Sequence, residues 1–171
     1  MASESAAVGL ARASLQHFLT SGGPLPVPVI LAQELTGRAG VFVSLKKQGQ
    51  LRGCIGTFEP TRINIASEII YNAISAGTED PRFWPVELEE LAEVTISVDV
   101  LEAPQLIDSI DKLDPQKYGV IVKRGRRSGL LLPMLEGVDT VAAQISIAKE
   151  KAGISPEEEV ELYRFSVTRY T

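Results

Sequence analysis

Cysteine and histidine are almost absent from the sequence. Its 171 residues include one cysteine, Cys54, and one histidine, His17. A single thiol excludes an internal disulfide, a cysteine zinc site and a self-held iron–sulfur cluster, because each needs several thiolates. One imidazole cannot build a histidine-rich metal centre, and a Cys–His catalytic pair would need a tertiary contact between distant positions. We therefore expect no metal ion and no cofactor.

Long apolar runs and an excess of positive charge are missing as well. No apolar stretch approaches the ~20 residues that a membrane helix needs, and the first ten residues lack the basic start and apolar stretch of a signal peptide. The 17 Lys and Arg against 22 Asp and Glu give a net charge of −5, which disfavours binding of nucleic acid through a general positive field. We expect a cytoplasmic protein that binds neither membrane nor nucleic acid.

What is present is an ordinary globular composition, with 44% hydrophobic and 23% charged residues. Helical spacing of apolar residues predicts helices over 3–19, 61–76 and 140–152, and the sequence at 155–158 resembles a further helix start. Alternation predicts hairpins over 41–47 with 51–58 and over 118–123 with 129–132, a strand over 94–100 and a closing strand at 163–167. This order predicts an α+β fold around a mostly antiparallel sheet with packed helices. We expect a single domain over 1–171, which can include a smaller subdomain around 104–135.

The first candidate site is the strand predicted over 51–58. Gly53 and Gly56 interrupt it, and such glycines mark a bulge or a close approach of ligand or backbone. Alternation puts Arg52 and Cys54 on one face, where a guanidinium can favour the thiolate or bind an anionic group. Cys54 is therefore a candidate nucleophile, assisted by Arg52. The alternative is a small buried cysteine, with glycines that let a helix pack closely.

The second candidate site is the segment 80–85, in which prolines fix the backbone. Asp80 offers an acid, Arg82 an anion-binding fork, and Phe83 a wall for a pocket. The alternative is a structural loop whose charged residues pair locally. The only basic cluster is Lys123, Arg124, Arg126 and Arg127, at the turn predicted over 124–128, where solvated charge is commoner than phosphate binding.

These segments resemble the AMMECR family. The resemblance rests on residues 40–45, 51–56, 80–83, 95–98 and 129–133, in this order, and it covers most of the chain. It implies an α+β fold in two unequal subdomains but no particular reaction. In bacteria and archaea, members of this kind are called protein A of the AmmeMemoRadiSam system, beside a Memo-like protein and a radical SAM enzyme. The residues of the family motif are Arg52, Gly53, Cys54, Gly56, Asp80, Arg82 and Phe83.

Two hypotheses about function stay open. In the first, the chain is a component of a modification pathway, acts with Memo-like and radical SAM proteins, and uses the thiol of Cys54. In the second, it is a non-catalytic module that recognises an anionic ligand, a peptide or a protein partner through Arg52 and Arg82. The sequence does not decide whether the chain is an enzyme.

Overall fold

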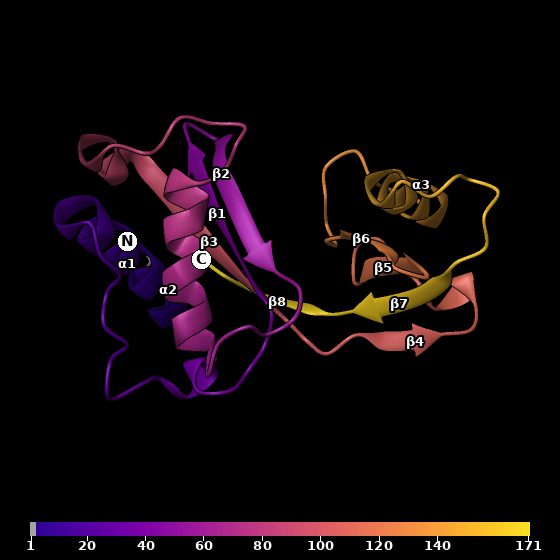
Figure 1. Ribbon diagram of the computed structural model, residues 1–171, viewed down its shortest axis with the longest axis horizontal. Helices are drawn as coiled ribbons and strands as arrows, with labels where there is room; N and C mark the ends of the chain where they lie inside the picture. Colours follow the sequence, from indigo (N-terminus) through magenta and orange to yellow (C-terminus); the bar gives the residue numbers. More distant parts are fainter. Residues whose placement is uncertain (1–2) are drawn as a thin grey trace. The chain divides into compact units, whose positions relative to one another are not determined.

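The computed structural model describes residues 3–171 as three α-helices, three short 3₁₀ helices and eight strands (Figure 1). In chain order these are α1 (Ala6–Ser21), η1 (Gln33–Leu35), β1 (Val41–Lys47), β2 (Gln50–Thr57), α2 (Ile65–Thr78), η2 (Leu88–Glu93), β3 (Val94–Leu101), β4 (Gln105–Ile107), η3 (Ile110–Lys112), β5 (Gly119–Arg124), β6 (Arg127–Leu131), α3 (Val141–Ala152), β7 (Glu161–Phe165) and β8 (Val167–Tyr170). The strands form two four-stranded sheets, ordered β2-β1-β3-β8 and β4-β7-β5-β6. The pairings of β1 with β2 and β3, and of β7 with β4 and β5, are antiparallel. The predicted α+β class is confirmed.

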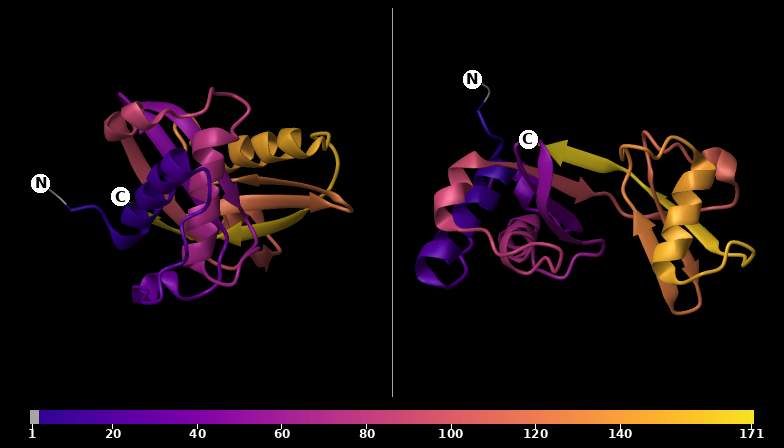
Figure 2. Two further views of the ribbon diagram at one scale, coloured as in Figure 1. Left: turned by 60° about the vertical axis from the view of Figure 1, so that its left-hand side comes forward. Right: turned by 90° about the horizontal axis from the view of Figure 1, so that it is seen from above.

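The chain divides into two compact units (Figure 2). The first consists of residues 3–100 and 168–171 and contains α1, α2 and the sheet β2-β1-β3-β8. The second consists of residues 101–167 and contains α3 and the sheet β4-β7-β5-β6.

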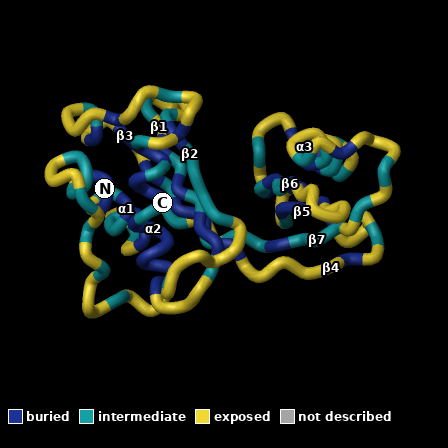
Figure 3. Tube along the Cα trace, in the orientation of Figure 1, coloured by how far each residue is buried: buried dark blue, intermediate teal, exposed yellow. Residues whose placement is uncertain are grey.

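In the first unit, α2 packs on β1 and β2, and α1 packs on α2. Val41, Val43 and Leu45 of β1 are buried on the face that meets the helices, and most of α2 is buried too (Figure 3). The side chain of Asn64 caps α2 by accepting a hydrogen bond from the backbone N–H of Ser67 at 2.8 Å. The helical layer therefore covers one face of this sheet.

A left-handed glycine ends α1 and α3 but not α2. At the end of α1, Gly22 adopts the left-handed conformation with φ 79°, as the predicted stop requires. The predicted end of α2 before Gly77 is wrong, because α2 runs on to Thr78. A Cβ at Gly77 would lie 2.6 Å from Cδ1 of Leu15, so this glycine lets α1 and α2 approach closely.

Two other predictions near the end of the chain are wrong. No helix starts at 155–158; the backbone turns there, and the side chain of Glu158 accepts the N–H of Ser155 at 2.8 Å. The single closing strand is in fact β7 and β8, which belong to different sheets. The sequence at 155–158 resembles a helix cap, but no amphipathic helical pattern follows it, so the segment forms a turn instead.

Candidate functional site

Cys54 lies on β2, on the sheet face opposite the helices. Its neighbour Gly53 faces α2, because a Cβ there would lie 2.1 Å from the carbonyl oxygen of Ala76. Cys54 pairs with Ser44 of β1, and its Sγ lies 3.2 Å from the Oγ of Ser44. The backbone N–H of Cys54 bonds to Asp80 rather than to β1, so this is a non-hydrogen-bonded pair, in which side chains come closest. The thiol is half-buried.

Asp80 and Arg82 hold the backbone of Cys54. The carboxylate of Asp80 accepts the N–H of Cys54 at 3.0 Å, and the Nη2 of Arg82 donates to the carbonyl oxygen of Cys54 at 3.5 Å. Arg82 also binds Asp80 through Nε at 3.0 Å and Nη2 at 2.8 Å. Since β2 is an edge strand, these two side chains take the place of a neighbouring strand at Cys54. The structure thus brings together Cys54, Asp80 and Arg82, three of the residues predicted from the sequence.

The electrostatics of this pair are those of a buried carboxylate bound to a cation. Asp80 is only 4% exposed. The hydrogen bond from Arg82 holds the pKa of Asp80 well below its usual value of 3.8, against the opposing effect of burial. The same bond raises the pKa of Arg82, against the opposing effect of burial. Asp80 is therefore ionised at neutral pH and is not available there as a general acid.

Arg52 is held away from the thiol. The register of β1 and β2 shifts between Leu45 and Lys46, so Arg52 is the extra residue of a β-bulge and the predicted alternation is interrupted there. Its Nε donates to Glu90 at 2.7 Å, and its Nη1 donates to the carbonyl oxygen of Trp84 at 2.8 Å. No hydrogen bond or ion pair between Arg52 and Cys54 occurs within residues 3–171. Arg52 fixes the segment that follows Asp80.

Protein atoms occupy the space beside both glycines of the motif. The helix carbonyl of Ala76 lies over Gly53, and the ring of Phe42 lies where a Cβ of Gly56 would stand, at 2.3 Å. Phe42 pairs with Gly56 across the strands, so its ring covers the glycine. These contacts account for Gly53 and Gly56 without a ligand. Phe83 is half-buried, and its ring lies 5.4 Å from the guanidinium carbon of Arg82.

Sequence reasoning missed Ser44 and a second aspartate–arginine pair on the same sheet face. Asp99 of β3 pairs with Phe42 and is 1% exposed. It accepts hydrogen bonds from Nε and Nη2 of Arg169 of β8 at 2.7 and 2.9 Å. The hydrogen bonds from Arg169 to Asp99 raise the pKa of Arg169, against the opposing effect of burial. The alternation over 94–100 placed Asp99 on the polar face of that strand, but only the order of the strands shows that its partner is Arg169.

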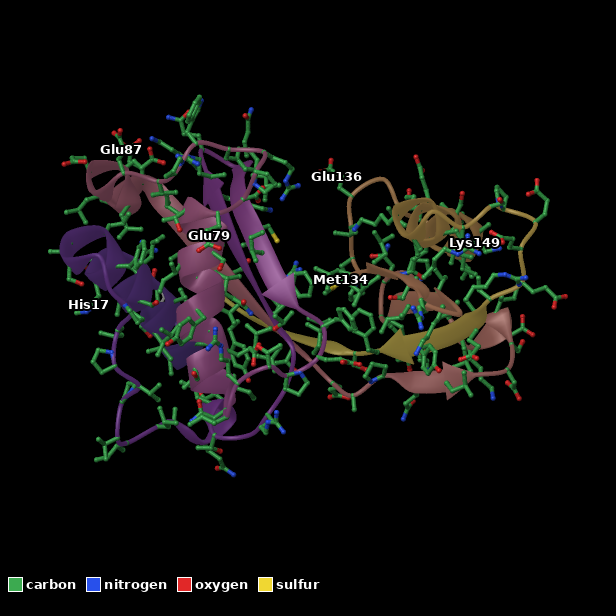
Figure 4. All side chains as sticks on the ribbon, viewed as in Figure 1. His17, Glu79, Glu87, Met134, Glu136 and Lys149 are labelled. Atoms are coloured by element: carbon green, nitrogen blue, oxygen red, sulfur yellow. The ribbon has the colours of Figure 1, made fainter. Side chains whose placement is uncertain are left out.

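Other sequence candidates do not join this site. His17 lies on α1, in the helical layer (Figure 4), whereas Cys54 faces the other side of the sheet. In the basic turn of the second unit, Arg124 and Arg127 are bound to Glu158. Among residues 3–171, no group of three or more His, Cys, Asp or Glu side chains is arranged to hold a metal ion, and no helix there has the length and apolar character to cross a membrane.

Comparisons with known proteins agree with this architecture. A sequence model of the AMMECR1 family matches residues 8–170. A protein of Clostridium acetobutylicum is 52% identical over 165 residues, which cover 95% of this chain but 35% of that protein, so the chain spans about a third of that relative's length. A protein of Thermotoga maritima is 57% identical over 135 residues, 78% of each chain. The crystal structure of an uncharacterised protein from Pyrococcus horikoshii matches with a TM-score of 0.87 at 33% identity, covering 95% of this chain and 88% of that one.

Proposed function

This chain belongs to the AMMECR1 family, and we propose that it is a component of a modification pathway to which it contributes the thiol of Cys54. A Memo-like protein and a radical SAM enzyme are its proposed partners, in accordance with the family resemblance. In this role the Cys54 thiolate attacks an electrophilic carbon of the substrate and forms an S–C bond. The leaving group departs with the electron pair of the bond that breaks, and the thiol proton passes to solvent.

The observation that carries this proposal is the placement of the thiol. Cys54 is half-buried on the sheet face without helices, and its only hydrogen-bonding neighbour within residues 3–171 at the sulfur is Ser44. Its backbone is fixed on both sides, at the N–H by Asp80 and at the carbonyl oxygen by Arg82. Asp80 is accordingly a positioning residue in this proposal. A cysteine that served only as a small core residue would lie among buried apolar side chains instead.

The test is alkylation by iodoacetamide, which reports on Cys54 alone because the chain has no other thiol. We expect the native protein to react at neutral pH at least as fast as the chain unfolded in urea. Cys54→Ser should abolish the adduct and leave the melting temperature nearly unchanged. Protection of the native thiol until the protein unfolds would refute the proposed role of Cys54, as would a large loss of stability in the variant.

The partners require a separate experiment. The tagged chain, co-expressed with a Memo-like protein and a radical SAM enzyme of the same organism, should retain both through a wash of moderate ionic strength. If neither is retained, the proposed pathway is contradicted even when the thiol is reactive.

A second candidate function is a non-catalytic binding module. The observation that favours it is that neither Arg52 nor Asp80 is free to assist Cys54 in catalysis, because Arg52 binds Glu90 and Asp80 binds Arg82. Of the two arginines, recognition would then fall to Arg82, whose side chain is 57% exposed. Cys54→Ser discriminates between the two functions. A module would keep its partners and its effect on the pathway in this variant, whereas a thiol component would keep the partners and lose the effect.

A further inference from the structure

Two arginines of the first unit are held in the same way by buried aspartates. Arg82 binds Asp80 through Nε and Nη2, and Arg169 binds Asp99 through the same two nitrogens. The side chains of both aspartates are 2% exposed, whereas those of Arg82 and Arg169 are 57% and 38% exposed. Each guanidinium is therefore anchored on its inner edge and open to solvent on its outer edge.

The outer nitrogen of each guanidinium is free. Within residues 3–171, no hydrogen bond joins Nη1 of Arg82 or Nη1 of Arg169 to a protein atom. A guanidinium bound along one edge by a carboxylate has lost much of its rotational freedom, so that little conformational entropy remains to be lost when its outer edge binds a ligand. Guanidinium groups in this state suit carboxylate and phosphate oxygens.

The two arginines approach Cys54 from opposite edges of the first sheet. Arg82 reaches the outer edge of β2 at the carbonyl oxygen of Cys54. Arg169 belongs to β8, the other edge strand, and Asp99 holds it on the sheet face that carries Cys54 and Ser44. Cys54 pairs with Ser44, Ser44 pairs with Ser97 of β3, and Asp99 lies two residues from Ser97 on the same face. The register therefore places the Asp99–Arg169 pair on the sheet face that carries the thiol.

We propose that Arg82 and Arg169 form an oxyanion-binding site beside Cys54, so that the molecule received there carries a carboxylate or phosphate group. This inference rests on the proposed function only in assuming that Cys54 is the reacting group. Each aspartate neutralises its arginine, so recognition comes from the directed Nη1 donors more than from net charge. Asp80 and Asp99 are positioning residues for these donors.

The test compares two alkylating reagents of nearly equal size, iodoacetate, which is anionic, and iodoacetamide, which is neutral. For each protein, the ratio of the two second-order rates is divided by the same ratio for the chain unfolded in urea. Because both donors are partly exposed, each contributes only a small factor, and the two together should raise the normalised ratio about threefold at low salt. Because the site is open to solvent, 0.5 M salt should bring the ratio back toward one.

Variants assign the effect to the two arginines. Arg82→Gln and Arg169→Gln should each lower the ratio, and together they should abolish the preference. Arg38→Gln is the matched control, since Arg38 is an exposed arginine of the same unit that binds the carbonyl oxygens of Pro60 and Arg62. If a glutamine variant does not fold, Arg→Lys at that position keeps a cation for the aspartate but removes the outer Nη1, and should still lower the ratio.

The outcomes separate this inference from the proposed function. A thiol that reacts with iodoacetamide but shows a normalised ratio of one overturns the oxyanion site and leaves the proposed function standing. If neither reagent reacts, the proposed function fails, and the site is judged by thermal stability in inorganic phosphate at constant ionic strength. A rise in Tm that is lost in the Arg82→Gln/Arg169→Gln protein supports the site, and the absence of a rise refutes it.

Discussion

Replacing Gly53 by alanine should strongly destabilise the first unit. The added Cβ would lie 2.1 Å from the carbonyl oxygen of Ala76 and 3.2 Å from its carbonyl carbon, whereas ordinary contacts begin at 3.4 Å. Both atoms are backbone of α2, so no rotamer change relieves the overlap, and helix and strand must separate by roughly 1.3 Å. Such overpacking costs about 3 kcal/mol, a large part of the roughly 5–15 kcal/mol that stabilises a typical domain.

The assay is urea unfolding followed by circular dichroism, with Gly9→Ala as the matched control. Gly9 lies within α1, and no heavy atom other than those of its chain neighbours and its own helix backbone lies within 4 Å of the position of its Cβ. The same substitution there should stabilise the protein by about 0.5–1 kcal/mol, because alanine is the better helix former. A Gly53→Ala protein within about 0.5 kcal/mol of the wild type would refute the close packing of β2 on α2.

Three other substitutions test the hydrogen bonds of three carboxylates, Glu68, Asp80 and Glu158. Glu68 is buried and accepts hydrogen bonds from Thr57, twice from Thr61 and from the N–H of Arg62. Glu68→Gln turns an NH₂ group toward these donors, so it should lower the free energy of unfolding in urea by about 2–3 kcal/mol. An unchanged free energy of unfolding would show that the carboxylate is dispensable. Asp80→Asn leaves the guanidinium of Arg82 without its carboxylate, so it should lower the free energy of unfolding by about 2 kcal/mol. It should also speed hydrogen exchange of the Cys54 amide, whereas unchanged exchange would contradict the hydrogen bond from this amide to Asp80. The hydrogen bond from Arg127 lowers the pKa of Glu158 from 4.5 to about 2. The contribution of Glu158 to stability is therefore present above pH 4.5 and is lost as the pH falls toward 2. The urea midpoint of Glu158→Gln should fall less over this pH range than that of the wild type, and parallel curves for the two proteins would contradict this prediction.

The sequence predicted those elements whose signals are local. The hairpin of β1 and β2, the strand β3 and the helix α3 all follow from alternation and helical spacing. Gly77 was misjudged as a helix end because the reason for it lies on another helix, at Leu15. The sequence alone does not distinguish a glycine that ends a helix from one that lets a neighbouring helix pack closely, because the difference lies in the tertiary contacts.

For the candidate site, the sequence predicted the chemistry but not all of the partners. Cys54, Asp80 and Arg82 were selected from two motifs and do lie together. The shared face of Arg52 and Cys54 was inferred from strict alternation, which the bulge at Arg52 interrupts. Arg169 could not be selected, because its role depends on β8 lying next to β3, although Arg169 and Asp99 are 70 residues apart in the sequence.

The edge of β2 links the stability of the sheet to the candidate site. An edge strand presents unpaired N–H and C=O groups, and proteins commonly block such edges with charged side chains. Here Asp80 and Arg82 bind the N–H and C=O of Cys54, so the contacts that block the edge also hold the cysteine. A substitution at Asp80 must therefore act on both properties, because it frees the strand edge and loosens the backbone that carries the thiol. This coupling gives a structural reason for an aspartate and an arginine two residues apart in a segment remote in sequence from the cysteine.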